Sequence, residues 1–181
     1  MSSLREVAPH DEEKIREWRN LPEVRKYMYT DHEIGREEHR AWFSRILRDP
    51  TCKYWIIVYD GREVGVVNLY NIDHRNRRGH WGFYVGPKDR LKGVASFAWF
   101  SVLRFVFEEL KLQKLCGEVL ASNQAALNMH KKFGFYQEGS FRKHVFKGDR
   151  FADVVCFGLL REEWEAKKEE IELQLRAKGV I

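Results

Sequence analysis

The stretch from Val94 to Phe107 is the longest mostly apolar run of the chain, interrupted only by two serines and one arginine. It is too short to span a bilayer, because a membrane-crossing helix takes about 20 apolar residues. A helix over residues 93–110 would be apolar on nearly all sides, and such a helix has to be buried rather than lie on a surface. The rest of the chain must therefore supply a sheet against which this helix packs.

Strand signals lie on both sides of this helix. Residues 53–72 contain two runs of β-branched and aromatic residues around the turn signal Asp60-Gly61, which predicts a hairpin. Further strands are expected at 79–86 and 114–121, with a last hairpin at 135–160 around Gly148-Asp149. Hairpins combined with a central strand–helix–strand–helix unit predict an α/β fold with a mixed sheet and helices on both faces.

The other helices are amphipathic or capped. The stretch 35–49 places four apolar residues on one stripe, Trp42, Phe43, Ile46 and Leu47, which predicts a surface helix with a core-facing side. Asn123 is a good N-cap for a short helix at 124–133. Also expected are a strand at 4–8, a helix at 11–19, a helical turn from Pro22 toward Met28 and a charged C-terminal helix at about 161–178. No repeat or linker divides the chain, so residues 1–181 are expected to form a single domain.

The composition, 44% hydrophobic and 33% charged, is that of a globular protein rather than a disordered one. The first residues contain no apolar signal core, which predicts a cytoplasmic protein. Three widely spaced cysteines fit reduced thiols, and no histidine pair has metal-ligand spacing, so no metal is expected. The net charge of +5 favours anionic partners, but we expect neither nucleic-acid nor membrane binding. The C-terminal helix could pack on a second subunit of a homodimer, although a solvated helix is the default.

The segment GFYVGPKDRLKGVA, residues 82–95, leads from a strand into the apolar helix. A helix N-terminus presents unpaired amide N–H groups and binds anions readily. Gly93 has no side chain, and the side chain of Ala95 is only a methyl group. A diphosphate could therefore approach the backbone of residues 91–96. The basic side chains that could add charge are Lys88, Arg90 and Lys92. A basic loop at a glycine-containing helix start is also common, so the loop alone leaves both interpretations open.

Two motifs in order resemble the GNAT superfamily of N-acetyltransferases: RLKGVA, which fits [QR]-x-x-G-x-[GA], and NQAALNMHKKFGF farther along the chain. The resemblance covers roughly residues 60–160. It implies acetyl-CoA as the acetyl donor, bound where a mostly antiparallel mixed sheet is splayed between its two central strands. The residues implied to contact it are Phe83, Tyr84 and Val85 at the pantetheine, Arg90, Leu91, Lys92, Gly93, Val94, Ala95 and Ser96 at the pyrophosphate, and Asn123 and His130 at the thioester.

His130 stands where the superfamily usually has a tyrosine that protonates the departing CoA thiolate. A thiol pKa near ~8.5 means that this thiolate leaves tolerably well without an acid. A neutral imidazole is a poor proton donor and an imidazolium a good one, so an acid role would weaken as the pH rises above the pKa of His130. Packing of the ring on the cofactor is the alternative, and both roles stay open here.

Glu118 is the candidate general base. Strand alternation puts Glu118 and Leu120 on one face of their strand and Val119 on the other. The acceptor amine must be neutral to attack the thioester, and Glu118 could take its proton through a water that Asn68 helps to hold. A solvent-facing strand residue is the competing interpretation. Direct transfer needs no enzyme nucleophile, so Cys116 is expected to pack rather than to react.

The acceptor side is expected in the N-terminal third. The segment WRNLPEVRKYMYTDHEIGREEH resembles the acceptor-side region of acetyltransferases that act on nucleotide-linked 4-amino sugars in pseudaminic acid biosynthesis. This implies a UDP-linked 4-amino-4,6-dideoxy sugar contacted by Arg19, Met28, Tyr29, His39 and Tyr84. Arg19 can pair a diphosphate bidentately, while Met28 and Tyr29 offer apolar and stacking surface. Core packing of Met28 and Tyr29, and a helix-end salt bridge of Arg19, are the alternatives.

Other readings of the sequence stay open beside this one. The loop at 73–80 carries Arg75, Arg77 and Arg78, which could hold substrate phosphates or form a solvated hairpin tip. Ribosomal-protein N-terminal acetyltransferases have a similar start and the same cofactor motifs, but their peptide acceptor needs an open acidic or polar groove. A basic module that binds RNA or protein without catalysis is the rival of another class.

Overall fold

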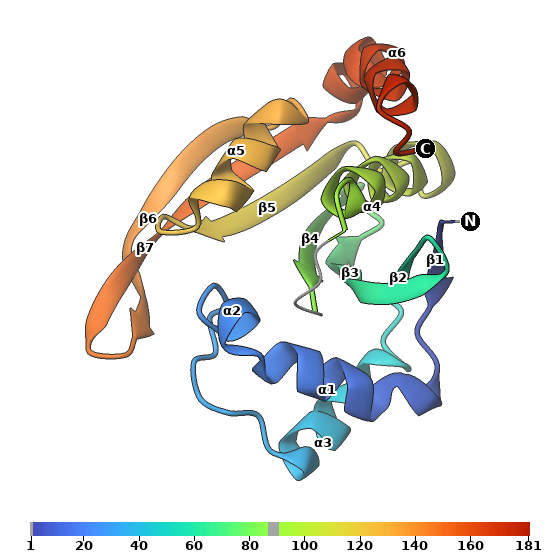
Figure 1. Cartoon of the computed structure of the whole chain (residues 1–181). Coiled ribbons are helices and arrows are strands. Elements are labelled where there is room, and N and C mark those ends of the chain that lie inside the picture. Colours follow the sequence, from blue (N-terminus) through green and yellow to red (C-terminus); the bar gives the residue numbers. More distant parts are fainter. Residues whose placement is uncertain (1, 87–90) are drawn as a thin grey trace.

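The computed structural model describes residues 2–86 and 91–181. Within them, seven strands form one sheet in the order β1-β2-β3-β4-β5-β7-β6 (Figure 1). The strands are β1 (Ser3–Glu6), β2 (Lys53–Tyr59), β3 (Arg62–Asp73), β4 (Arg78–Val85), β5 (Lys114–Leu120), β6 (Tyr136–Lys147) and β7 (Arg150–Leu160). Neighbouring strands are antiparallel except β4 and β5, which are parallel. The predicted mixed, mostly antiparallel sheet is confirmed.

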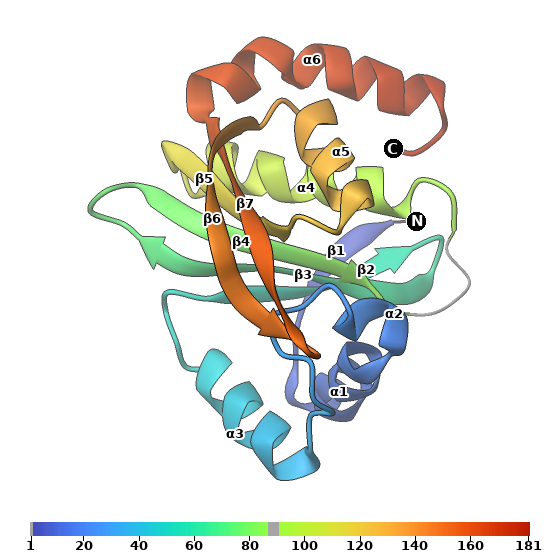
Figure 2. The same cartoon turned by 90° about the vertical axis from the view of Figure 1, so that its left-hand side faces the viewer.

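Helices cover both faces of the sheet, as predicted (Figures 1 and 2). One face carries α1 (Glu12–Asn20), α2 (Pro22–Arg25) and α3 (Arg36–Ile46), and the other carries α4 (Val94–Arg104), α5 (Gln124–Lys132) and α6 (Arg161–Ala177). A short 3-10 turn, η1 (Pro9–Asp11), precedes α1. In the part of the chain that is described, no helix combines the length and the apolar character that a membrane crossing requires.

The apolar helix that dominates the sequence is buried, but it is not uniform. Seven of the eleven residues of α4 are buried against the sheet, α5 and α6. The helix then widens into a π-helical turn, η2 (Phe105–Glu109), in which the Leu110 N–H donates to the Phe105 carbonyl at 2.9 Å. The prediction of one helix over 93–110 therefore holds for its position and burial, but not for its regularity.

The apolar stripe on α3 differs from the prediction at one residue. Phe43 and Ile46 are buried together with Ile15 of α1 and Val66 of β3. Leu47 is 44% exposed, so its placement in the core-facing stripe was wrong. The helix ends at Ile46, and Leu47 is the residue that follows the last turn.

Strands β4 and β5 separate along their length. They pair only where Arg78–His80 lies beside Lys114–Cys116. Beyond this point β4 keeps β3 as its partner as far as Val85, and β5 keeps β7 as far as Leu120. The sheet is thus splayed between its two central strands, as the family resemblance implied, and the two strand edges that face the gap have no strand partner among the described residues.

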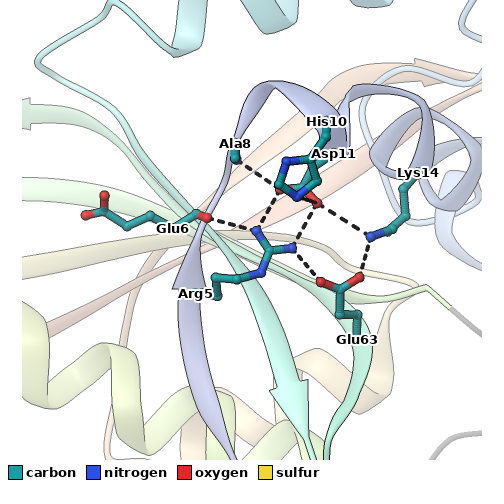
Figure 3. Close-up of polar contacts among 7 residues, drawn as sticks. All are labelled: Arg5, Glu6, Ala8, His10, Asp11, Lys14 and Glu63. Atoms are coloured by element: carbon teal, nitrogen blue, oxygen red, sulfur yellow. Dashed lines mark hydrogen bonds and ion pairs between the residues drawn. The ribbon is translucent and has the colours of Figure 1, made fainter.

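A cluster of charged residues fixes the start of α1 to the sheet (Figure 3). Asp11 is fully buried, and its carboxylate accepts two hydrogen bonds of 2.9 Å from Arg5 on β1 and one of 2.9 Å from the Ala8 N–H. Arg5 also pairs with Glu63 of β3 at 2.5 Å, and Lys14 of α1 pairs with the same carboxylate. This network anchors the helix that carries Arg19 at its other end.

Candidate active site

A cavity of about 880 Å³ opens where β4 and β5 separate. Its walls come from both sides of the sheet: the start of α4 and one side of α5 on one face, and α1, the segment after α2, and α3 on the other. This volume is in the range of small-molecule and cofactor sites. The cavity therefore joins the region predicted for the cofactor to the region predicted for the acceptor.

The turn before α4 depends on a glycine, and most residues around it line the cavity. Gly93 has φ +100°, which is left-handed backbone that glycine adopts most readily. A Cβ at this position would lie 2.5 Å from the Tyr59 hydroxyl oxygen and 3.1 Å from Val180 Cγ2. The Tyr59 hydroxyl also donates to the Lys92 carbonyl at 3.3 Å. Leu91, Gly93, Val94, Ala95 and Ser96 line the cavity, while Lys92 is exposed. Arg90 and Lys88 lie outside the described residues.

The end of β4 forms one edge of the gap. Phe83 and Val85 pack with the α4 side of the sheet, and Tyr84 packs with the α1–α3 side. All three line the cavity. Burial raises the pKa of Tyr84, so its hydroxyl stays protonated at neutral pH. The free backbone edge of this strand is available to pair with an extended amide-containing chain, which is what a pantetheine arm offers.

His130 is buried, with 5% of its surface exposed, although it reaches the cavity wall. Its Nδ1 lies 2.9 Å from the Ala126 carbonyl oxygen, which can only accept, so Nδ1 carries the proton and Nε2 is left as an acceptor. Nε2 has no hydrogen-bond partner among the described residues. The ring stacks on Phe157 with centroids 4.6 Å apart.

Burial lowers the pKa of His130 to about 4, opposed only by the hydrogen bond to Ala126. The imidazole is therefore neutral at neutral pH, and the imidazolium acid considered from the sequence is not available there. Of the two roles weighed, packing beside the cofactor fits this environment. Asn123 also lines the cavity, and its Oδ1 accepts a 3.2 Å hydrogen bond from the Ala126 N–H, so it caps α5 as predicted.

Glu118 and Asn68 both line the cavity, from β5 and β3 respectively. The Asn68 side chain lies over Gly82, where a Cβ would be 2.8 Å from Asn68 Oδ1. Glu118 accepts a 2.6 Å hydrogen bond from the Tyr29 hydroxyl. Burial, and then this hydrogen bond, raise the pKa of Tyr29, so Tyr29 stays the donor. Glu118 thus lies on the acceptor side of the sheet and holds a contact that sequence reasoning missed.

Arg19 lies in the wall of the acceptor half. Its Nη1 is buried without a hydrogen-bond partner, and no carboxylate within the described ranges forms an ion pair with it. Burial lowers its pKa, while the nearby Tyr84 acts in the opposite direction. The helix-end salt bridge considered for Arg19 is therefore not formed in this part of the structure. Met28 lines the same wall.

His39 is placed differently from the other candidates for the acceptor site. It lines the cavity, but its ring is buried, with Nε2 2.8 Å from the Glu12 carbonyl oxygen. Burial lowers its pKa, so the neutral ring ties α3 to the first turn of α1. Because the ring is fixed in the core, it is better suited to defining the shape of the cavity wall than to making a polar contact with a ligand.

The three arginines of the 73–80 loop do not join the site. Arg75, Arg77 and Arg78 are exposed, and Arg78 lies 3.9 Å from Asp73 at the end of β4 that is remote from Val85. Of the two interpretations left open, the solvated hairpin tip is the one that agrees with this placement.

Sequence reasoning missed two tryptophans of the cavity wall. Trp81 on β4 and Trp99 on α4 both line the cavity and pack around His130, with ring centroids 5.6 Å and 4.7 Å from it. Strand alternation offered a signal for Trp81, because it shares a face with Phe83. Glu23 and Glu38 also line the cavity and were not predicted from the sequence.

Comparison with known proteins places this geometry in a family. Residues 3–136 match the family model described as an acetyltransferase (GNAT) domain. The chain is 34% identical over 128 residues to the SPbeta prophage-derived uncharacterized N-acetyltransferase YokL of Bacillus subtilis (strain 168), covering 70% of this chain and 71% of that protein. It is 28% identical over 147 residues to the acetyltransferase PseH of Campylobacter jejuni subsp. jejuni (strain 81-176), covering 80% of this chain and 90% of PseH.

The fold is also that of a solved acetyltransferase. The spermidine N-acetyltransferase from Vibrio cholerae, crystallised in complex with CoA and spermine, superposes with a TM-score of 0.83 at 21% identity. The match covers 91% of this chain and 98% of that one, and at this identity it speaks for the fold alone. From the matched domain, the splayed sheet and the glycine turn at the start of α4, we conclude that the chain belongs to the GNAT family of acetyltransferases, enzymes that transfer the acetyl group of acetyl-CoA to an amine.

Proposed function

We propose that this acetyltransferase acts on the amine of an anionic small molecule, a UDP-linked 4-amino-4,6-dideoxy sugar, and that Arg19 holds its diphosphate. The observation that carries the proposal is the Arg19 guanidinium, which lines the acceptor half of the cavity with a buried nitrogen that lacks a partner in the described chain. Arg19 is half-buried, and a buried guanidinium nitrogen without a partner is costly. A diphosphate would offer the guanidinium the bidentate partner that arginine prefers. Binding of an anionic acceptor would therefore be favourable at this position.

The reaction is a direct transfer. The neutral amine attacks the thioester carbonyl carbon of acetyl-CoA, the new C–N bond forms, and the C–S bond breaks to release CoA thiolate. Glu118 takes the proton that the amine loses, through a water for which Asn68 is the second partner. The thiolate needs no obligatory acid, which agrees with the neutral state of His130.

The relatives support this acceptor class without excluding others. The similarity to PseH extends over 80% of the chain, and the segment from Trp18 to His39 carries the acceptor-side resemblance. A polyamine is the second candidate, because the carboxylates of Glu23, Glu38 and Glu118 line the same cavity and would suit a cationic acceptor. Arg19 opposes that candidate, since two cations would share one wall.

The test is an acceptor panel with acetyl-CoA as donor: a UDP-linked 4-amino sugar, spermidine, and an N-terminal peptide of a ribosomal protein. We expect acetylation of the sugar, competition by UDP against the sugar, and no competition by UDP against acetyl-CoA. Arg19→Ala should raise the KM for the sugar by about 10- to 100-fold, which corresponds to the loss of a hydrogen bond to a charged group. Arg40→Ala removes an exposed arginine of α3 and serves as the control. Turnover of spermidine or the peptide, with no effect of UDP, would refute the proposal.

A further inference from the structure

The closed end of the β6–β7 hairpin holds the segment that follows α2. Lys147, the last residue of β6, donates from Nζ to the Met28 carbonyl at 2.6 Å and to the Arg25 carbonyl at 3.2 Å. The next residue, Gly148, donates its N–H to Asp31 Oδ2 at 2.9 Å. Both cartoon views show the closed end of this hairpin, at one edge of the sheet, extending toward the side where α2 lies (Figures 1 and 2).

These contacts are charge-assisted, because each has an ionised side chain as donor or acceptor. The Arg25 carbonyl also accepts from the Met28 N–H at 3.0 Å, so the Lys147 ammonium adds a second hydrogen bond to the turn that follows α2. Here the ammonium comes from a strand that is more than a hundred residues away in the sequence. The tether is therefore long-range, and it depends on how the hairpin is placed.

The tethered segment has little regular structure of its own. Residues 26–35 contain turns and bends but no helix or strand. Their second anchor is at Ile34, whose N–H donates to Asn20 Oδ1 at 2.8 Å and whose carbonyl accepts from Asn20 Nδ2 at 2.9 Å. One end of the segment is thus held by α1 and the other by the hairpin.

The tether bears directly on the acceptor side of the site. Met28, whose carbonyl Lys147 holds, lines the cavity, and the next residue, Tyr29, donates its hydroxyl to Glu118 at 2.6 Å. The β6 strand also contacts Tyr29 itself, since the His144 ring lies edge-on to the Tyr29 ring with centroids 6.4 Å apart. The hairpin thus contacts both Tyr29 and the residue that precedes it.

We propose that Lys147 is a positioning residue of the acceptor half-site: it holds the carbonyls of Arg25 and Met28 and thereby sets Tyr29 against Glu118. The role rests on the proposed function in one respect, which is that Glu118 serves the acceptor amine. Lys147 itself is expected to touch neither substrate. Its loss should therefore weaken use of the acceptor and leave use of acetyl-CoA unchanged.

The first measurement needs no acceptor. Hydrogen–deuterium exchange of the full-length free protein is compared for wild type, Lys147→Met, Lys147→Arg and the control Lys143→Met, which changes an exposed lysine of the same strand. Lys147→Met should speed exchange of the amides at 26–31 by roughly tenfold or more, because the variant loses the charge-assisted hydrogen bonds of Lys147. Lys147→Arg should restore most of the protection, and Lys143→Met should match wild type. Unchanged exchange at 26–31 in Lys147→Met overturns the inference.

The second measurement is steady-state kinetics with whichever amine of the acceptor panel the wild type acetylates. Lys147→Met should lower kcat/KM for that amine by about 10-fold or more, with the KM for acetyl-CoA unchanged. An equal loss in acetyl-CoA use marks a general structural role and overturns the inference. If Lys147→Met does not fold, Asp31→Asn weakens the other hairpin contact and must show the same split. If the nucleotide sugar is not a substrate, only the proposed function is overturned. The exchange measurement uses no acceptor, and the comparison of amine and acetyl-CoA kinetics can be made with another amine.

Discussion

Replacing His130 with phenylalanine should flatten the dependence of stability on pH. The folded protein holds the pKa of His130 at about 4, against an ordinary value of 6.5. Between these two values the unfolded chain binds a proton that the folded protein does not. The contribution of His130 is therefore complete above about pH 6.5 and is lost as the pH falls toward 4.

The size of the effect follows from the shift. A difference of about 2.5 pKa units corresponds to roughly 3 kcal/mol in the free energy of unfolding, of which about 2 kcal/mol is lost by pH 5. Phenylalanine keeps a planar ring against Phe157 and cannot take up a proton. The variant should accordingly lose about 2 kcal/mol less than wild type between pH 7.5 and pH 5.

The assay is urea unfolding of the wild type, His130→Phe and the control His74→Phe at pH 7.5, 6 and 5. Comparison with wild type is necessary because burial also lowers the pKa of His39 and of His80, which act in the same pH window. His74 is exposed in the turn after β3, so the control should follow wild type. A His130→Phe protein that loses as much stability as wild type between pH 7.5 and 5 would refute the account of His130 as a buried neutral ring.

Three further predictions concern the framework, the donor and the base. Burial opposes ionisation of Asp11, but Arg5 and the Ala8 N–H hold its pKa at about 2, so its carboxylate stabilises the fold above about pH 4. Asp11→Asn should lower the free energy of unfolding in urea by about 2 kcal/mol at pH 7, and this difference from wild type should vanish toward pH 2. Gly93→Glu should abolish the rise in melting temperature caused by acetyl-CoA, because it puts a side chain on left-handed backbone against Tyr59 and adds a negative charge at the start of α4. An unchanged rise would contradict the proposal that this turn binds the pyrophosphate. Glu118→Gln should lower kcat by about 10²- to 10⁴-fold with acetyl-CoA affinity retained, and a His130→Phe enzyme that is more impaired than Glu118→Gln would reverse the two roles.

Local signals in the sequence were sufficient where local geometry decides the structure. Asp60 and Gly61 both have positive φ, which is what their turn between β2 and β3 requires, and the hairpin follows from that pair. The π-helical turn after Arg104 was not predicted, because an all-apolar stretch has the same pattern in an α-helix and in a wider helix. Leu47 was misplaced because periodicity alone does not say at which residue a helix ends.

The two halves of the site differ in how far the sequence reveals them. The donor half is largely one continuous segment, from Phe83 to Ser96, so its composition and its motif can be read together. The acceptor half is assembled from contacts between distant positions: Tyr29 and Glu118 are 89 residues apart, and Lys147 and Met28 are 119 apart. No spacing rule connects such pairs. The resemblance pointed to Met28 and Tyr29, and strand alternation pointed to Glu118, but nothing in the sequence indicated Lys147 or these contacts.

In the proposed reaction, the alternation of β5 separates the base Glu118 from position 130, where the family resemblance implies a tyrosine. Gly117 faces α5, and a Cβ there would lie 2.5 Å from His130 Nε2, whereas the next residue, Glu118, points to the opposite face and meets Tyr29. In the proposed reaction the amine approaches from the side of Glu118, and the thioester lies in the gap that His130 borders. Glu118, which removes the proton, and His130, which lies beside the departing sulfur, are therefore separated by β5, one on each of its faces. A substitution at position 130 alters the surroundings of the sulfur and leaves the path of the amine proton intact.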